Sequence, residues 1–256
     1  MIYIISHKTF KEPELENYVS LQVGARGKES ICSFRDDEAD NISDKNPHFC
    51  ELTGLYWIWK NVADEYKGLV HYRRYFGKSN WSSSLKHIYT YKELVNMLED
   101  ADIILPYIES LKQDAKTEIL RECCTPEIFL ELEDVIKELY PDYIMDFDKF
   151  FSQNKVSLFN MMFCRAEYFD EYCKWLFDIL FELEKRVDLS KLNAYQQRLY
   201  GFLSERLLNV WVIHEGLKVK HVPVIQTEMK FRQKLTLFRR RITNQIYFKM
   251  ANKGEK

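Results

Sequence analysis

Residues 68–76 read Gly-Leu-Val-His-Tyr-Arg-Arg-Tyr-Phe. The Leu-Val pair after a turn glycine is typical of a buried strand, and His71, Arg73 and Arg74 follow where that strand ends. Ligands of α/β proteins bind at the carboxyl ends of parallel strands, so the pattern predicts an anion site at the end of a central strand. The alternative interpretation is that the arginines form surface ion pairs and that His71 is a satisfied core residue.

A helix is predicted directly before this strand. Asn46 is a suitable cap and Pro47 suits the first helical position, after which apolar residues recur at helical spacing. We therefore expect a helix that leads into the strand and delivers its charged end. The recurring apolar residues are Leu52, Leu55, Tyr56, Trp59 and Val62.

The composition is that of a globular protein. Of the 256 residues, 46% are hydrophobic and 15% aromatic, which is enough to fill a substantial core. No low-complexity tract is visible, so extensive disorder is not expected. No apolar run approaches the roughly 20 residues that span a bilayer, so we expect any membrane contact to be peripheral. The six cysteines show no CxxC spacing and the short apolar start is not a signal peptide, so we expect a cytoplasmic protein.

Two further strands are predicted for the same sheet. Residues 2–5 form a short β-rich run that ends in Ser6, His7 and Lys8, which places polar groups at the carboxyl end of the first strand. Residues 102–106 read Asp-Ile-Ile-Leu-Pro and predict another strand, stopped by its proline.

Three later segments carry a polar residue or a proline within an apolar pattern. Residues 156–164 are expected to be extended, and the amide of Asn160 in their middle requires a hydrogen-bond partner. Residues 218–225 suit a late edge strand, because Pro223 is tolerated only at an edge or a bulge. Glu205 lies on the second of two long helices that otherwise belong to the core.

Residues 36–40 read Asp-Asp-Glu-Ala-Asp in a predicted loop. Carboxylates so spaced can bind a divalent cation, which makes Asp36 and Asp40 alternative ligands for Mg²⁺ or Mn²⁺. Such clusters are more often solvated loops, so the first expectation is that no metal cofactor is used.

The last segment, residues 229–256, differs in kind. Nine Lys or Arg residues stand against one acid, which gives a net charge of +8; since the whole chain carries −2, residues 1–228 carry −10. Aromatic and aliphatic residues alternate with the basic ones, as in a helix lying on an anionic bilayer. Nucleic acid is the competing partner and a solvated tail the plainest alternative, but the large apolar share favours lipid.

Residues 40–61 read Asp-Asn-Ile-Ser-Asp-Lys-Asn-Pro-His-Phe-Cys-Glu-Leu-Thr-Gly-Leu-Tyr-Trp-Ile-Trp-Lys-Asn. Together with residues 68–76, they resemble the signature of a bacterial family first catalogued as domain of unknown function 4422. The resemblance extends from Ile2 to about Val224 and includes the opening Ile-Ile-Ser-His-Lys, the Asn-Met-Met-Phe run and the Leu-Ser-Glu-Arg-Leu helix. Members of that family are glycosyltransferases associated with capsular and exopolysaccharide synthesis.

The resemblance implies a GT-A-like, Rossmann-like α/β glycosyltransferase domain over residues 1–228, with a mostly parallel central sheet flanked by helices. It implies transfer of a hexose, galactose in pyranose or furanose form being one guess, from a nucleotide sugar, UDP-linked in our expectation, to a glycan or lipid-linked glycan. The tail of residues 229–256 would then hold the enzyme at the inner face of the cytoplasmic membrane.

The site expected from these two lines of reasoning has a donor side and an acceptor side. Where many GT-A enzymes have a metal-binding Asp-x-Asp motif, this chain has the basic residues after the central strand, which favours a metal-independent enzyme. Glu205 is the first candidate for the general base of an inverting transfer and Glu51 the second, whereas an ion pair of Glu205 with Arg206 or Arg198 is the structural alternative. The expected donor-binding residues are Ser6, His7, Lys8, His71, Arg73, Arg74 and Asn160.

A function of a different class stays open at this point. The chain is also compatible with a non-catalytic, glycan-binding scaffold of a membrane-associated polysaccharide assembly. A scaffold, however, does not require polar residues concentrated at strand ends.

Overall fold

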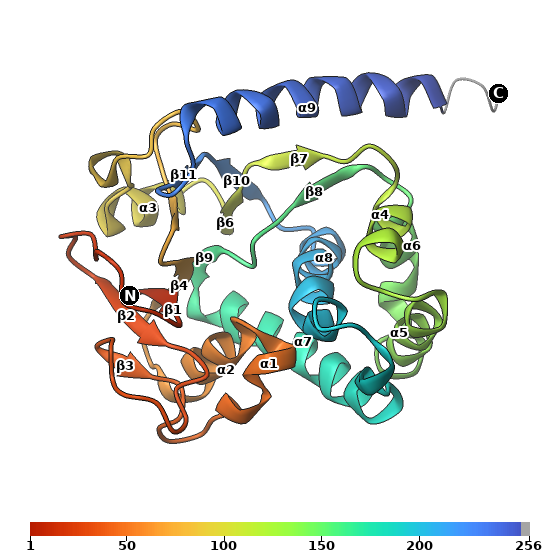
Figure 1. Ribbon diagram of the computed structural model, residues 1–256, viewed down its shortest axis with the longest axis horizontal. Helices are drawn as coiled ribbons and strands as arrows, with labels where there is room; N and C mark the ends of the chain where they lie inside the picture. Colours follow the sequence, from red (N-terminus) through yellow and green to blue (C-terminus); the bar gives the residue numbers. More distant parts are fainter. Residues whose placement is uncertain (252–256) are drawn as a thin grey trace. The chain divides into compact units, whose positions relative to one another are not determined.

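The computed structural model describes residues 1–251 and is shown in Figure 1. Contacts divide the chain into two compact units, so the predicted boundary at Glu228 is one of several points where the chain passes between them. Residues 252–256, which include Lys253, Glu255 and Lys256 of the basic tail, lie outside the described residues. Unit 1 comprises Met1–Tyr107, Phe159–Lys174 and Leu217–Glu228, and unit 2 comprises Ile108–Leu158, Trp175–Gly216 and the segment from Met229 onward.

Unit 1 is built on a nine-stranded sheet, counted over the described part of the chain. The strand order is β10-β6-β9-β4-β1-β2-β3, with β5 and β11 paired beside β4, and β4, β1, β2 and β3 run parallel. The prediction of an α/β fold with a mostly parallel central sheet is confirmed. The strands are β1 (Ile2–Ser6), β2 (Tyr18–Gln22), β3 (Phe34–Arg35), β4 (Tyr66–His71), β5 (Arg74–Phe76), β6 (Ile103–Pro106), β9 (Met162–Arg165), β10 (Val219–Val222) and β11 (Val224–Gln226).

Helices cover both faces of this sheet. Successive residues of β1 point to opposite sides of the sheet, so Ile5 and Ile4 face different helices. Gly54 lies so close to one face that a Cβ there would come within 2.6 Å of Ile5 Cδ1. On the other face, Ile4 and Val70 share a buried cluster with Leu94. The helices of this unit are α1 (Asn46–Phe49), α2 (Leu52–Asn61) and α3 (Tyr91–Met97), and α7 (Ala166–Arg186) begins in it.

The helix predicted over residues 46–62 is broken into α1 and α2. Cys50 lies between them with a φ of +52°. Asn46 is therefore not the cap of one long helix: its amide donates to the Cys50 carbonyl at 2.7 Å and to Thr53 Oγ1 at 3.1 Å. These two bonds hold the break in place and put Glu51 at the start of α2.

Two predicted strands are also interrupted. Within residues 156–164, β8 ends at Ser157 and β9 begins at Met162, because the chain turns through the left-handed region at Phe159 and Asn160. The late strand breaks at Pro223 into β10, which lies at the edge of the sheet, and β11, which pairs antiparallel with β5. Proline lacks an N–H, so it ends one ladder where the next begins.

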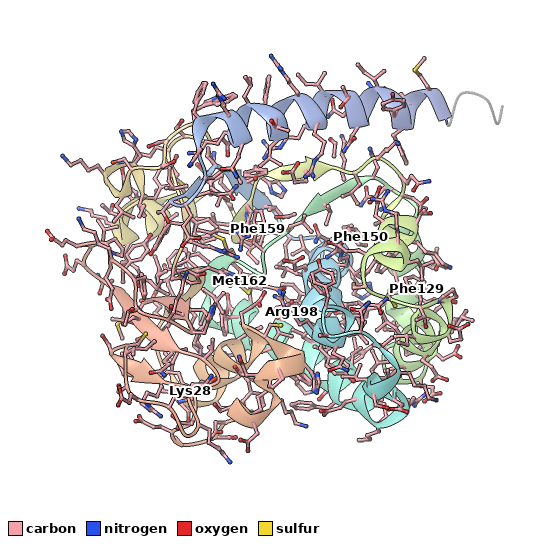
Figure 2. All side chains as sticks on the ribbon, in the orientation of Figure 1. Lys28, Phe129, Phe150, Phe159, Met162 and Arg198 are labelled. Atoms are coloured by element: carbon pink, nitrogen blue, oxygen red, sulfur yellow. The ribbon has the colours of Figure 1, made fainter. Side chains whose placement is uncertain are left out.

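Unit 2 is mainly helical and packs around aromatic side chains. The rings of Phe129, Phe147 and Phe151 lie 4.5–5.5 Å apart between centroids and are almost fully buried; Figure 2 labels Phe129 and, from the same core, Phe150. Its elements are β7 (Ile108–Ser110), α4 (Ala115–Glu122), α5 (Pro126–Leu139), α6 (Ile144–Phe151), β8 (Lys155–Ser157), α8 (Leu199–His214), α9 (Phe231–Ala251) and the second part of α7.

The basic C-terminal segment forms α9, which lies along β7 in Figure 1. Arg241 donates to both oxygens of the buried Glu109 carboxylate at 2.8 and 2.9 Å, and the Asn244 amide donates to the Ser110 carbonyl at 2.8 Å. This helix is thus packed onto unit 2 through a paired, buried charge. Over residues 1–251, none of the helices is both long and apolar enough to cross a bilayer.

Candidate active site at the carboxyl edge of the unit 1 sheet

The ends of β1 and β4 bring two groups of predicted site residues together. The strands are parallel with Ile5 beside His71, and Tyr72 N donates to the Ile5 carbonyl at 3.0 Å. Ser6 is buried, and its hydroxyl donates to the Lys8 carbonyl at 2.6 Å, which turns the chain as it leaves β1. The residues that follow β1 and those that follow β4 therefore lie at one edge of the sheet, as the sequence predicts.

The Tyr72 ring is the platform on which the basic side chains gather. Lys8 Nζ lies 4.9 Å and Arg73 Cζ 5.5 Å from its centroid, and the His7 ring packs edge-on against it at 5.5 Å. Cations near an aromatic ring are attracted to its electron-rich face. Two positive charges are thereby held on a single ring at the exposed end of the sheet.

The loop at Phe159, labelled in Figure 2, is held by residues of the same edge. His71 Nε2 lies 2.6 Å from the Phe159 carbonyl, and the Arg74 guanidinium lies 4.6 Å from the Phe159 ring centroid. Because a carbonyl only accepts hydrogen bonds, Nε2 carries the hydrogen. Arg74 is the first residue of β5, and its side chain lies against the loop at Phe159.

His71 is kept neutral by its surroundings. Burial lowers its pKa and is the largest cause. The Glu51 charge comes next and raises the pKa, the Arg74 charge lowers it, and the bond to Phe159 and the Arg73 charge have smaller, opposite effects, so the net shift is downward. A neutral ring with hydrogen on Nε2 leaves Nδ1 without a proton. His71 therefore presents an acceptor at neutral pH instead of a further positive charge beside Lys8, Arg73 and Arg74.

Asn160 has the partner that its apolar surroundings require. Its amide donates to Glu51 Oε1 at 2.8 Å, and the residue is almost fully buried. This bond brings the first turn of α2 into the same constellation as His71. Glu51, the second candidate base, lies with the predicted donor residues in unit 1.

Glu205, the first candidate base, belongs to unit 2. It accepts a bond from Arg206 at 2.9 Å, and the buried Arg206 guanidinium also donates to Glu122 at 2.8 Å. The ion pair with Arg206 that the sequence left open as a structural alternative is present. The carboxylate thus neutralises a buried arginine.

The two alternative metal ligands, Asp36 and Asp40, differ in burial and in hydrogen-bond partners. Asp36 is fully buried and accepts from Gly24 N at 2.8 Å, Ala25 N at 3.0 Å and Ser43 Oγ at 2.6 Å. Asp40 is exposed and accepts from the Tyr56 hydroxyl at 3.1 Å. Over residues 1–251, no three His, Cys, Asp or Glu side chains come together as a group that could hold a metal ion.

Sequence reasoning missed Glu228. Its carboxylate lies 3.5 Å from Lys8 Nζ and 3.4 Å from Arg73 Nη1. It reaches them because β11 pairs antiparallel with β5, with Gln226 beside Arg74. A pairing between segments about 150 residues apart leaves no local signal, so sequence reasoning could not place Glu228 at this edge.

Comparison with known proteins places these observations in a family. Among solved structures, the fold is similar to the apo structure of the bifunctional glycosyltransferase WbbM, with a TM-score of 0.81 and 28% identity. The match covers 89% of this chain and 45% of the WbbM chain, so this chain spans less than half of that protein. No curated protein shows significant similarity. The model of the family described as a domain of unknown function (DUF4422) matches residues 1–216, and the chain therefore belongs to that family.

Proposed function

We propose that this protein is a glycosyltransferase that moves a hexose, for instance galactose, from a UDP-linked donor to a glycan or lipid-linked glycan in capsular or exopolysaccharide synthesis. The observation that carries the proposal is that Lys8 and Arg73 share the Tyr72 ring, with Arg74 beside Phe159, at the carboxyl edge of a parallel sheet. This edge is where α/β folds bind nucleotides. The similarity to a glycosyltransferase over 89% of the chain supports it.

The basic side chains have the role of neutralising the donor diphosphate. As the bond between the anomeric carbon and the diphosphate oxygen breaks, negative charge grows on the leaving group. Arginine binds phosphate through paired, charge-assisted hydrogen bonds and keeps its charge at every physiological pH. Lys8, Arg73 and Arg74 would supply three positive charges, so we propose that the reaction needs no divalent metal.

The geometry favours Glu51 over Glu205 as general base. Glu51 lies beside His71 and Asn160, in the same unit as the proposed donor residues, whereas Glu205 is paired with Arg206. In the proposed step, Glu51 takes the proton of an acceptor hydroxyl, whose oxygen attacks the anomeric carbon opposite the leaving diphosphate. One displacement of this kind inverts the anomeric configuration.

We propose further that α9 binds the inner face of the cytoplasmic membrane, where a lipid-linked acceptor would be presented. Beside the face that contacts Glu109, α9 carries an exposed apolar stripe at helical spacing, bordered by basic residues. This arrangement suits an anionic lipid surface. The stripe consists of Phe231, Phe238, Ile242, Ile246 and Met250, which are 44–68% exposed.

The donor site is tested by replacing its arginines. Arg73→Ala and Arg74→Ala are each expected to weaken UDP and UDP-galactose binding about tenfold or more, because each removes charged hydrogen bonds to phosphate. Isothermal titration calorimetry measures the affinities. Arg165→Ala is the matched control: Arg165 also pairs with a glutamate, Glu65 at 3.6 Å, and also lies over a tyrosine, but at the opposite end of β4. Wild-type affinity in both test variants would contradict the donor site.

The base is tested by turnover with a nucleotide-sugar donor and a glycan acceptor in the presence of EDTA. Glu51→Gln is expected to lower kcat about 100-fold or more while donor affinity changes little, since the amide cannot accept the proton. Glu205→Gln is the comparison and is expected to retain far more activity. A greater loss in Glu205→Gln would reverse the assignment of the base.

The same assay tests metal independence with the wild type. Turnover that requires added Mg²⁺ or Mn²⁺ would contradict it. Binding without turnover or hydrolysis would favour the glycan-binding scaffold.

The membrane surface is tested on the full chain, because removing α9 would leave the buried Glu109 unpaired. The double variant Ile242→Ser with Ile246→Ser is expected to bind anionic phospholipid vesicles at least about tenfold more weakly, since two apolar side chains no longer insert. Vesicle sedimentation measures the binding, and Met145→Ser, which changes a 79% exposed side chain on α6, is the control. Added salt should weaken the remaining electrostatic attraction. Equal vesicle binding by the double variant, or a preference of the wild type for DNA at equal salt, would contradict the proposal.

A further inference from the structure

Glu228 joins the two cations on the Tyr72 ring. Its Oε1 lies 3.5 Å from Lys8 Nζ, and its Oε2 lies 3.4 Å from Arg73 Nη1. One carboxylate thus bridges an ammonium and a guanidinium that the same ring supports. Geometrically, it takes the place that an anion shared by these two side chains would take.

The backbone fixes this carboxylate beside its partners. Thr227 N donates to the Arg73 carbonyl at 3.1 Å, and Gln226 pairs with Arg74 in the β11–β5 ladder. Thr227, the residue before Glu228, is therefore bonded to the backbone of Arg73, whose side chain Glu228 contacts. A side chain displaced from the cations stays within reach of them, at a high effective concentration.

The ion pairs themselves are weak enough to exchange. The side chains of Lys8, Arg73 and Glu228 are 50%, 43% and 52% exposed, and pairs of this kind contribute little to stability because water screens them. Glu228 is nonetheless charged at neutral pH: burial alone would raise its pKa, but the bonds to Arg73 and Lys8 outweigh burial and lower it.

We propose that Glu228 is an internal competitor for the phosphate-type anion that Lys8 and Arg73 bind. An incoming diphosphate displaces the carboxylate, and the carboxylate returns to the two cations when the diphosphate leaves. The inference rests on the donor site proposed above and assigns to that site a residue that limits how tightly it retains the diphosphate product. Release of product limits the turnover of many enzymes, so a weak competitor is an advantage there.

The test measures binding of inorganic pyrophosphate by calorimetry at low salt, with no sugar present. Glu228→Gln is expected to bind pyrophosphate about threefold to fivefold more tightly than the wild type, the range that an exposed ion pair accounts for. Glu65→Gln is the matched control, because it removes the same charge from another exposed pair, that with Arg165, and is expected to leave the affinity unchanged. In an Arg73→Gln background the gain from Glu228→Gln should shrink, since one of the two partners is gone.

The outcomes separate this inference from the proposed function. Wild-type pyrophosphate affinity in Glu228→Gln, an equal gain in Glu65→Gln, or no pyrophosphate binding by any of these proteins would overturn the competitor role. Turnover of a nucleotide sugar is a separate measurement, and its failure would overturn the transferase function without any change in the pyrophosphate result.

Discussion

The parallel pairing of β1 with β4 determines where the charged side chains of this protein meet. Ile5 lies beside His71, and the bond from Tyr72 N to the Ile5 carbonyl extends the contact one residue past the end of β4. The two strands are almost entirely buried, so a register shift of one residue would turn their apolar side chains to the wrong faces. The packing of the core therefore also places Lys8 and Arg73 at a common edge.

A second group of contacts offsets the strain of the loop at that edge. Non-glycine residues in the left-handed region cost on the order of 1–3 kcal/mol each, and Phe159 and Asn160 are two in succession. The bond from the neutral His71 ring to the Phe159 carbonyl is of the kind that contributes about 0.5–1.5 kcal/mol, and the bond from Asn160 to the Glu51 carboxylate is of the kind that contributes about 1.5–3 kcal/mol. The magnitudes are comparable, so the loop depends on His71 and Glu51, and the site residues hold one another in place.

The sequence predicted the strands and their polar ends well, because burial and charge are local signals. The positions of β1, β4 and β6 follow from short apolar runs, and residues 6–8 and 71–74 meet as expected. The left-handed turn at Phe159 and the pairing of β11 with β5 depend on contacts between distant segments, and local propensity carries no trace of them. The break at Cys50 is held by the nearby Asn46 side chain, but Asn46 followed by Pro47 also suits the start of an ordinary helix. Glu205 illustrates the same limit, since its partner Arg206 is itself held by the distant Glu122.

We propose that the edge with Lys8, Arg73 and Arg74 holds the diphosphate of a nucleotide sugar. A crystal structure of the full chain with UDP would show where the diphosphate binds. We expect the diphosphate to contact these three side chains and Glu228 to have left its place between Lys8 and Arg73. UDP bound elsewhere, with the Glu228 bridge intact, would contradict this proposal.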